Sequence, residues 1–153
     1  MSKILLEAIN VGKTFKHING NISLFNNLNL KIKHGDLIAL IGPSGSGKSS
    51  LLHLFALLDD TSKGKILING KETKNLTDSQ KDEIRRKNIS IIFQDNNLLT
   101  DFTALENVMI PLFIKGESKK YILKKTQRIL QDLKILNRSN HFPSELSGGE
   151  QQR

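Results

Sequence analysis

Polar and apolar positions alternate along the N-terminal part of the chain, which is the pattern of half-buried β-strands. Residues 4–10 alternate in this way, and residues 22–33 mostly keep a period of two. The apolar positions of the second stretch are Ile22, Leu24, Leu28, Leu30 and Ile32. This pattern predicts two strands at the start of the chain, of antiparallel character.

Two later stretches, residues 37–41 and 89–93, are short unbroken apolar runs. Such runs are typical of parallel strands that are buried on both faces. A further strand over 65–68 ends at Asn69-Gly70, a pair that favours a tight hairpin turn. Together these segments predict an α/β protein with a partly parallel sheet and an antiparallel N-terminal β part.

Four segments between and after these strands carry helical signals. Residues 48–58 form an apolar helical stretch directly after the run 37–41. Capping boxes predict the start of two more helices. Thr77 and Gln80 begin a helix that runs to about residue 87, and Thr103 and Glu106 begin one that runs toward residue 114. Residues 118–135 are amphipathic, with one apolar stripe at helical spacing: Ile122, Thr126, Ile129, Leu130, Leu133 and Leu136.

The chain of 153 residues carries a formal net charge of +8, and the amphipathic helix contributes most of it. Residues 115–138 hold eight basic residues against Glu117 and Asp132. Two interpretations of this helix stay open: a solvated face, or a contact with acidic lipid or an acidic protein. Nucleic acid is disfavoured as a partner, because Tyr121 is the only aromatic residue among these charges.

Composition excludes several classes of protein. The chain has no cysteine, so it forms no disulfide and offers no thiolate metal site or cysteine nucleophile. Its apolar runs are far shorter than the ~20 residues of a membrane span. Residues 1–15 make a poor signal peptide, because Glu7 interrupts their short apolar run. These features fit a cytosolic protein.

The strongest chemical signal is a full match to the phosphate-binding pattern G-x-x-x-x-G-K-S/T, formed by Gly42, Pro43, Ser44, Gly45, Ser46, Gly47, Lys48 and Ser49. Its glycines let the backbone approach a phosphate, and its N–H groups and the following helix N-terminus attract anions. Lys48 can reach the β- and γ-phosphates, and the Ser49 hydroxyl can bind Mg²⁺. The loop predicts binding of a nucleoside triphosphate, and at this point leaves ATP and GTP both open.

A second motif, Leu146-Ser147-Gly148-Gly149-Glu150-Gln151, lies near the end of the sequence. Ser147 and Glu150 form a capping box, and the two glycines leave backbone N–H groups uncovered in the first helical turn. By itself this motif is either a second anion site or a plain helix start.

The two motifs, about 100 residues apart, resemble the nucleotide-binding domain of ABC transporters, in which the second is the signature motif. Gln94 resembles the Q-loop glutamine of that family, and Phe15 resembles the aromatic residue that stacks on adenine. The resemblance runs along essentially the whole chain. It implies a P-loop NTPase fold of the ABC type over residues 1–153, with a helical subdomain over about residues 95–146.

The resemblance also implies ATP and Mg²⁺ as cofactors, and a homodimer with each ATP between one subunit's P-loop and the other's signature. Lys48 and Gln94 would then be catalytic, and Ser49 and Gln94 would bind the metal. Residues 95–114 would contact integral-membrane permease subunits, at the cytoplasmic face of the bacterial inner membrane. The residues that would contact ATP are Phe15, the P-loop residues 42–49 with Ser50, and Ser147, Gly148 and Gly149.

A narrower resemblance points to the ATPases of lipoprotein-releasing systems. It rests on residues 98–108 followed by Pro111-Leu112, on residues 51–54 followed by Leu58-Asp59, and on residues 140–145. Relatives that export macrolides or serve cell division share much of this pattern, so they remain alternatives.

The sequence departs from the family after the signature. The family's strand ending in Asp, the catalytic Glu after it and a later His have no counterpart among these 153 residues. We therefore expect a fold that is incomplete at the C-terminus and leaves the run 37–41 exposed, and a chain that binds ATP without hydrolysing it. A nonhydrolytic nucleotide-binding module is a further alternative, and a small P-loop kinase would leave the second motif unexplained.

Overall fold

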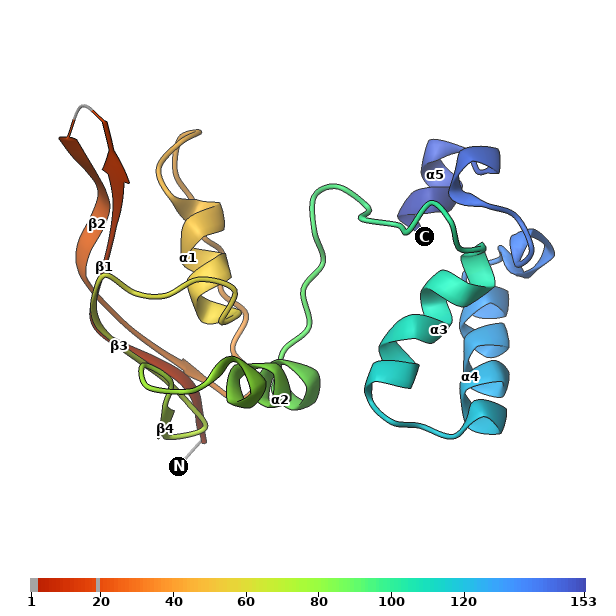
Figure 1. Cartoon of the computed structure of the whole chain (residues 1–153), viewed down its shortest axis with the longest axis horizontal. Coiled ribbons are helices and arrows are strands. Elements are labelled where there is room, and N and C mark those ends of the chain that lie inside the picture. The colour runs from red at the N-terminus through yellow and green to blue at the C-terminus, as the bar shows by residue number, and fades with distance from the viewer. Residues whose placement is uncertain (1–2, 19) are drawn as a thin grey trace. The chain divides into compact units, whose positions relative to one another are not determined.

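The computed structural model describes residues 3–18 and 20–153. The chain forms two compact units, Met1–Ser90 and Ile91–Arg153. The first unit combines a β-sheet with two helices, and the regular structure of the second is helical (Figure 1). Each unit is described below by itself.

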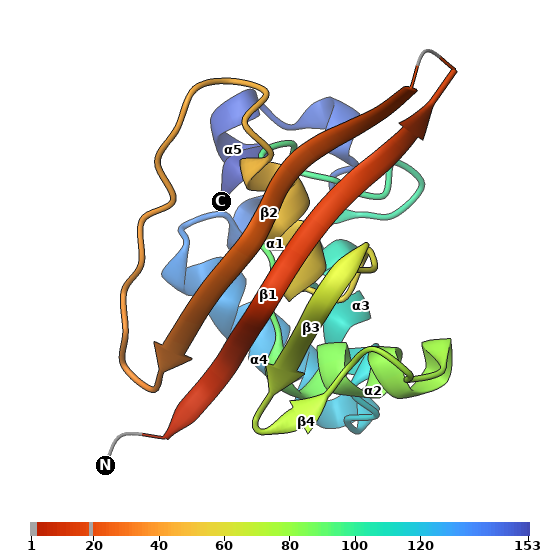
Figure 2. The same cartoon turned by 90° about the vertical axis from the view of Figure 1, so that its left-hand side faces the viewer.

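The sheet of the first unit has the strand order β2-β1-β3-β4, and each neighbouring pair is antiparallel. β1 (Ile4–His17) and β2 (Gly20–Lys33) form a long hairpin, and β3 (Lys63–Ile68) pairs with the other edge of β1 (Figure 2). β4 (Lys71–Glu72) follows a turn at Asn69-Gly70, where both residues have positive φ, 50° and 79°. The strands predicted at 4–10, 22–33 and 65–68, and this turn, are confirmed.

The core of the first unit lies between the sheet and α1 (Lys48–Phe55). Ala8 and Val11 both face this core although they are three positions apart, because a bulge at Asn10 (φ 50°) shifts the register between them. α1 is shorter than the predicted 48–58, since Leu57 adopts a left-handed φ of 57°. The buried members of the core are Ala8, Val11, Leu54, Leu57, Ile66 and Ile68.

α2 (Asp78–Asn88) begins at the predicted capping box. The Thr77 hydroxyl accepts a hydrogen bond from the Gln80 backbone N–H at 3.3 Å, and the Gln80 amide oxygen accepts one from the Thr77 N–H at 3.0 Å. Three of its four basic side chains are paired locally, because carboxylates of Asp60, Asp82 and Glu83 pair with Lys81, Arg85 and Lys87 respectively.

The two predicted buried strands are wrong. Residues 37–41 and 89–93 are neither helix nor strand, and Leu37 and Ile92 are fully exposed. A strand buried on both faces needs neighbouring strands for its backbone groups and apolar layers on each side. No strand of the described residues pairs with either run. The exposed apolar character expected for residues 37–41 is observed.

The second unit packs α3 (Ala104–Ile114) against α4 (Lys119–Asp132). α3 starts at the predicted capping box of Thr103 and Glu106. α4 ends three residues before the predicted 135, because Lys134 turns to a φ of 58° and the Ile135 N–H bonds back to the Leu130 carbonyl at 2.9 Å. The buried side chains of this unit include Leu112, Ile122, Thr126, Leu130 and Ile135.

The chain then forms two 3₁₀ turns, η1 (Leu136–Arg138) and η2 (Pro143–Glu145), and the short helix α5 (Gly148–Gln152). Backbone carbonyls of His141 and Ser139 accept hydrogen bonds from the N–H groups of Ala104 and Leu105, both at 2.9 Å. The segment before α5 therefore supplies hydrogen-bond acceptors for two backbone N–H groups in the first turn of α3, which have no partner within the helix. None of the described helices is both long enough and apolar enough to cross a membrane.

Candidate functional site

The P-loop connects the exposed run 37–41 to the N-terminus of α1. Gly45 and Gly47 have φ values of 79° and 88°, a left-handed conformation that suits glycine. The loop is tightly curled, because a Cβ on Gly42 would lie 2.9 Å from the Ser46 hydroxyl oxygen. The first turn of α1 contains no acidic residue, so its positive end is not neutralised by its own side chains. This geometry suits an anion.

The Lys48 side chain folds back over the loop. Its Nζ donates hydrogen bonds to the carbonyl oxygens of Gly42 and Pro43, at 2.8 and 2.7 Å. The ammonium group is thus held at the mouth of the curl formed by the glycines. A phosphate that enters the loop meets this cation and the N–H groups of α1 together.

The residues present fit a magnesium nucleotide. The glycine backbone curls so tightly that a side chain at Gly42 would clash with the Ser46 hydroxyl, and Lys48 supplies a positive charge beside this curl. Ser49 is the second residue of α1 and is exposed, so its hydroxyl is available to a hard cation that prefers oxygen ligands. Ser50, also in the first turn of α1, is partly buried.

Phe15 belongs to the same unit as the P-loop and lies near it through β2. Cross-strand pairing places Phe15 opposite Ile22 and Lys13 opposite Phe25. Leu24 and Phe25 in turn approach the P-loop, since a Cβ on Gly47 would lie 3.3–3.4 Å from their side chains. The Phe15 ring is 42% exposed, so part of it is available to a planar ligand.

In the second unit, α5 begins at the predicted capping box of the second motif. The Glu150 Oε2 accepts hydrogen bonds from the Ser147 N–H and hydroxyl, both at 2.8 Å. Arg138 of η1 donates from Nε to the other carboxylate oxygen at 2.9 Å. The backbone and hydroxyl bonds from Ser147, and then the bond from Arg138, lower the pKa of Glu150 to about 2.

This network makes a testable prediction about pH. Because the folded-state pKa of Glu150 lies below its ordinary value of 4.5, the cap stabilises the fold at neutral pH and is lost as the pH falls through about 2. We expect Arg138→Met to raise this pKa while leaving it below 4.5, because the bonds from Ser147 remain. An NMR titration of the Glu150 side-chain carbon measures it directly. Arg128→Met, which removes an exposed arginine of α4, should leave the titration unchanged.

Gln94 lines one polar groove of about 610 Å³ in the second unit together with Gln151, the one residue of the second motif in its lining. The Gln151 side chain is fixed in this groove, because its Nε2 donates hydrogen bonds to the carbonyl oxygens of Pro143 (2.8 Å) and Leu146 (3.2 Å). The Asn96 amide donates to the Gln151 amide oxygen at 3.5 Å. The sequence analysis assigned the neighbours at 95–98 and Thr100 to the permease contact and did not place them in one groove with Gln94. It gave Pro143, Ser144 and Gln152, which also line this groove, no role in a site.

The structure therefore brings the predicted site residues together in two groups. Phe15 and the P-loop residues 42–50 belong to the first unit, and Gln94 with residues 147–149 belongs to the second. A Cβ on Gly148 or Gly149 would meet nothing within 4 Å among the described residues. The packing of this chain therefore does not account for the two glycines, which leave an open surface beside Ser147.

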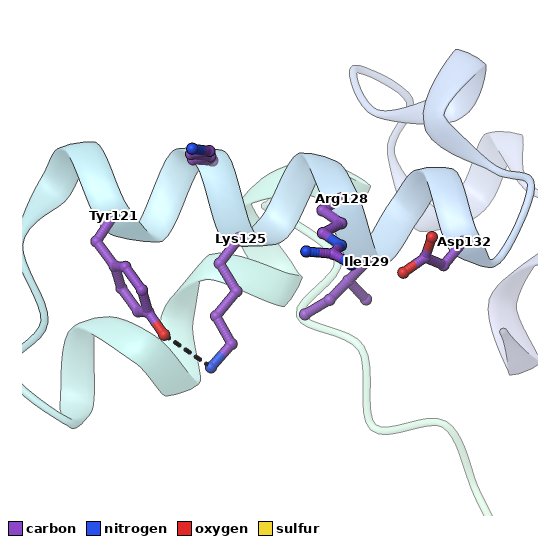
Figure 3. Close-up of a pocket in the computed structure, with 6 residues that line it drawn as sticks. Tyr121, Lys125, Arg128, Ile129 and Asp132 are labelled. Carbon is purple, nitrogen blue, oxygen red and sulfur yellow. Dashed lines mark hydrogen bonds between the residues drawn. The ribbon is translucent and has the colours of Figure 1, made fainter.

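The basic helix α4 presents a separate surface, shown in Figure 3. Tyr121, Lys125, Arg128, Ile129 and Asp132 lie along one side of α4 with Lys124 and line a shallow groove of about 480 Å³. The Lys125 ammonium donates to the Tyr121 hydroxyl at 3.2 Å and lies 5.3 Å from the ring centroid. In contrast to α2, the lysines of α4 make no ion pair with a carboxylate among residues 3–18 and 20–153.

Comparison with known proteins places this geometry in a family. Residues 25–153 match the ABC transporter family model. The chain is 45% identical over 150 residues to "Lipoprotein-releasing system ATP-binding protein LolD" of Wigglesworthia glossinidia brevipalpis, covering 98% of this chain and 66% of that protein. It is 41% identical over 153 residues to the LolD of Treponema denticola, covering all of this chain and 68% of that protein.

A solved structure agrees with these relatives. "Dimeric Structure of MJ0796, a Bacterial ABC Transporter Cassette" superposes with a TM-score of 0.88 at 37% identity, over 96% of this chain and 65% of that one. The chain thus spans about two thirds of the length of the proteins it matches. The predicted P-loop fold class of ABC type is confirmed, and the chain belongs to the ABC transporter family.

Proposed function

We propose that this protein binds Mg-ATP as the ATP-binding subunit of an ABC transporter that releases lipoproteins from the inner membrane. The observation that carries the nucleotide assignment is the curled P-loop with the Lys48 ammonium held over it. The transport assignment is supported by the names of the LolD relatives and by the resemblance of residues 98–112.

The site residues have separate roles in this proposal. The loop residues 42–47 and the first turn of α1 hold the phosphates, and Lys48 neutralises the β- and γ-phosphate charge. The Ser49 hydroxyl and the Gln94 amide oxygen are oxygen donors of the kind that Mg²⁺ prefers. Phe15 offers its exposed ring face to adenine.

The signature residues act across a homodimer in this proposal. Ser147, Gly148 and Gly149 would contact the γ-phosphate held by the P-loop of a second copy. Two observations support this role: the open surface beside the glycines, and the ionised Glu150 that holds the Ser147 hydroxyl. The related cassette MJ0796 forms a dimer, and one of its dimeric structures is bound to ADP and Pi.

Residues 95–114 are the proposed contact with the permease subunits, at the cytoplasmic face of the bacterial inner membrane. Part of this segment lines the polar groove with Gln94, so a permease seated there would touch the Gln94 loop directly. On this proposal about residues 95–146, within the second unit, are the helical subdomain that couples nucleotide to transport.

The ABC family hydrolyses ATP, and for these 153 residues alone we propose binding without turnover. The family's water-activating Glu and its later His have no counterpart among them. Phosphate release by the 153-residue chain should therefore not exceed that of its Lys48→Ala variant. Phosphate release clearly above that of the variant would contradict the proposal that these 153 residues bind ATP without hydrolysing it.

Depletion of the protein in its own cell tests the transport assignment. If the proposal is correct, lipoproteins accumulate in the inner membrane fraction, measured by membrane separation and immunoblotting. Re-expression of the wild-type gene should restore sorting, and re-expression with Lys48→Ala should not. Normal lipoprotein sorting together with macrolide sensitivity or failed septation would instead favour a related exporter or cell-division complex.

A further inference from the structure

Lys13 is a charged side chain in a buried position, since the residue is only 7% exposed. Its Nζ donates to the Asp59 carboxylate at 2.6 Å and to the Asp60 carbonyl oxygen at 2.9 Å. The same ammonium lies 4.8 Å from the centroid of the Phe15 ring, within the range of a cation–π contact. Burying an ammonium is costly unless it is paired, and here its partners hold it at one fixed place.

The loop after α1 fixes this part of β1 in two further ways. The Ser62 N–H donates to the Gly12 carbonyl at 2.9 Å. The Ser62 hydroxyl accepts from the Thr14 N–H at 3.0 Å and donates to the Thr14 carbonyl at 3.1 Å. Lys13 therefore sits in the middle of a three-residue segment whose backbone is bound on both sides of it.

Asp59 is suited to hold Lys13 at neutral pH. Its partial burial acts to raise its pKa, but the hydrogen bond and the charge of Lys13 outweigh that effect, and the pKa lies below its ordinary value. The Asp59 side chain is 35% exposed, so this carboxylate remains solvated on its outer side. The two groups thus form a short, directional salt bridge.

The Phe15 ring consequently has two different faces. The Lys13 ammonium lies over one face, and 42% of the residue remains exposed. The ring stands on the strand that pairs with β2, whose Leu24 and Phe25 approach Gly47 of the P-loop. The proposed contact with the base would use the exposed part of this ring.

We propose that Lys13, anchored by Asp59 and the Asp60 carbonyl, is a positioning residue that holds the Phe15 ring in place for the nucleotide base. The inference rests on the proposed binding of ATP and adds to it a residue that acts through Phe15. Stacking on a ring is tolerant of base identity, so Lys13 supports ATP and GTP alike.

Calorimetric titration with two ligands tests this role. Mg-ATP carries a base, and magnesium tripolyphosphate carries the phosphates alone. We expect Lys13→Met to weaken ATP binding roughly fivefold and to leave tripolyphosphate binding unchanged within about twofold. Lys13→Arg keeps a cation over the ring and should recover most of the loss. Lys16→Met, the same substitution at an exposed lysine of β1, should change neither affinity.

Asp59→Asn provides a second variant in case Lys13→Met folds poorly. It keeps the lysine but loosens its anchor, so a smaller loss with the same selectivity for ATP supports the proposal. An equal loss for both ligands would mean that Lys13 only supports the P-loop, and no loss for ATP would mean that the ring needs no support. Either outcome overturns the inference and leaves the proposed function standing. Binding of neither ligand by the wild-type protein would overturn both.

Discussion

Lys48→Ala is expected to weaken binding of Mg-ATP by about 100-fold, because it removes the charge-assisted contacts of the P-loop cation with the phosphates. Lys48 is the first residue of α1, and among residues 3–18 and 20–153 its ammonium donates hydrogen bonds only to loop carbonyls. Alanine is a good helix former, so the helix itself should persist. Isothermal titration calorimetry of the wild type and the variant at one salt concentration measures the effect.

Lys124→Ala is the control for the change in net charge. Lys124 is an exposed residue of α4 in the other unit, so its loss should leave the affinity for ATP within about twofold of the wild type. Equal affinities for the wild type and Lys48→Ala would refute the assignment of the P-loop as the phosphate site. A similar loss of ATP affinity in both variants would mean that the effect comes from the change in net charge and not from a contact of Lys48 with the phosphates.

Gly64→Ala is expected to destabilise the first unit by about 3–5 kcal/mol, from backbone strain and a steric clash together. Gly64 has a φ of 73°, and a Cβ there would lie 2.3 Å from the Asn10 carbonyl oxygen and 2.4 Å from that of Ile9. These atoms belong to the bulge that lets the side chains of Ala8 and Val11 both face the core. The backbone of β1 cannot move away without disturbing that bulge.

Gly70→Ala separates the two causes. Gly70 has nearly the same φ, 79°, but a Cβ there would meet nothing within 4 Å. This variant should lose only the cost of the left-handed conformation, about 1 kcal/mol. Urea unfolding followed by circular dichroism gives both values. Similar losses in the two variants would show that the close approach of β3 to the bulge is not what requires glycine at position 64.

Features that depend on neighbours in sequence were predictable. The capping boxes at Thr77, Thr103 and Ser147 were found correctly, because each is defined by two residues three positions apart. The hairpin turn at Asn69-Gly70 was found for the same reason. The P-loop was recognisable because its residues are contiguous in sequence, while the roles assigned to those residues remain predictions.

Features that depend on distant partners were not predictable. The runs 37–41 and 89–93 have the composition of buried strands, but burial is a property of their surroundings, and the described residues supply no paired neighbour. Lys13 and Asp59 are 46 positions apart, and neither carries a signal that indicates the other. Likewise, no sequence pattern indicates that Arg138 donates a hydrogen bond to Glu150. The electrostatics that hold both groups of site residues thus become visible only in the fold.

The two carbonyl bonds of Lys48 also bear on which anions can occupy the loop. Two of the three N–H donors of the ammonium are engaged by the Gly42 and Pro43 oxygens, so a ligand that takes over these donors exchanges one set of hydrogen bonds for another. A lone orthophosphate has to satisfy the ammonium and the α1 amides with one set of oxygens. A polyphosphate chain divides these tasks between successive groups. A ligand with several linked phosphates therefore offers more oxygens for this exchange than a single orthophosphate does.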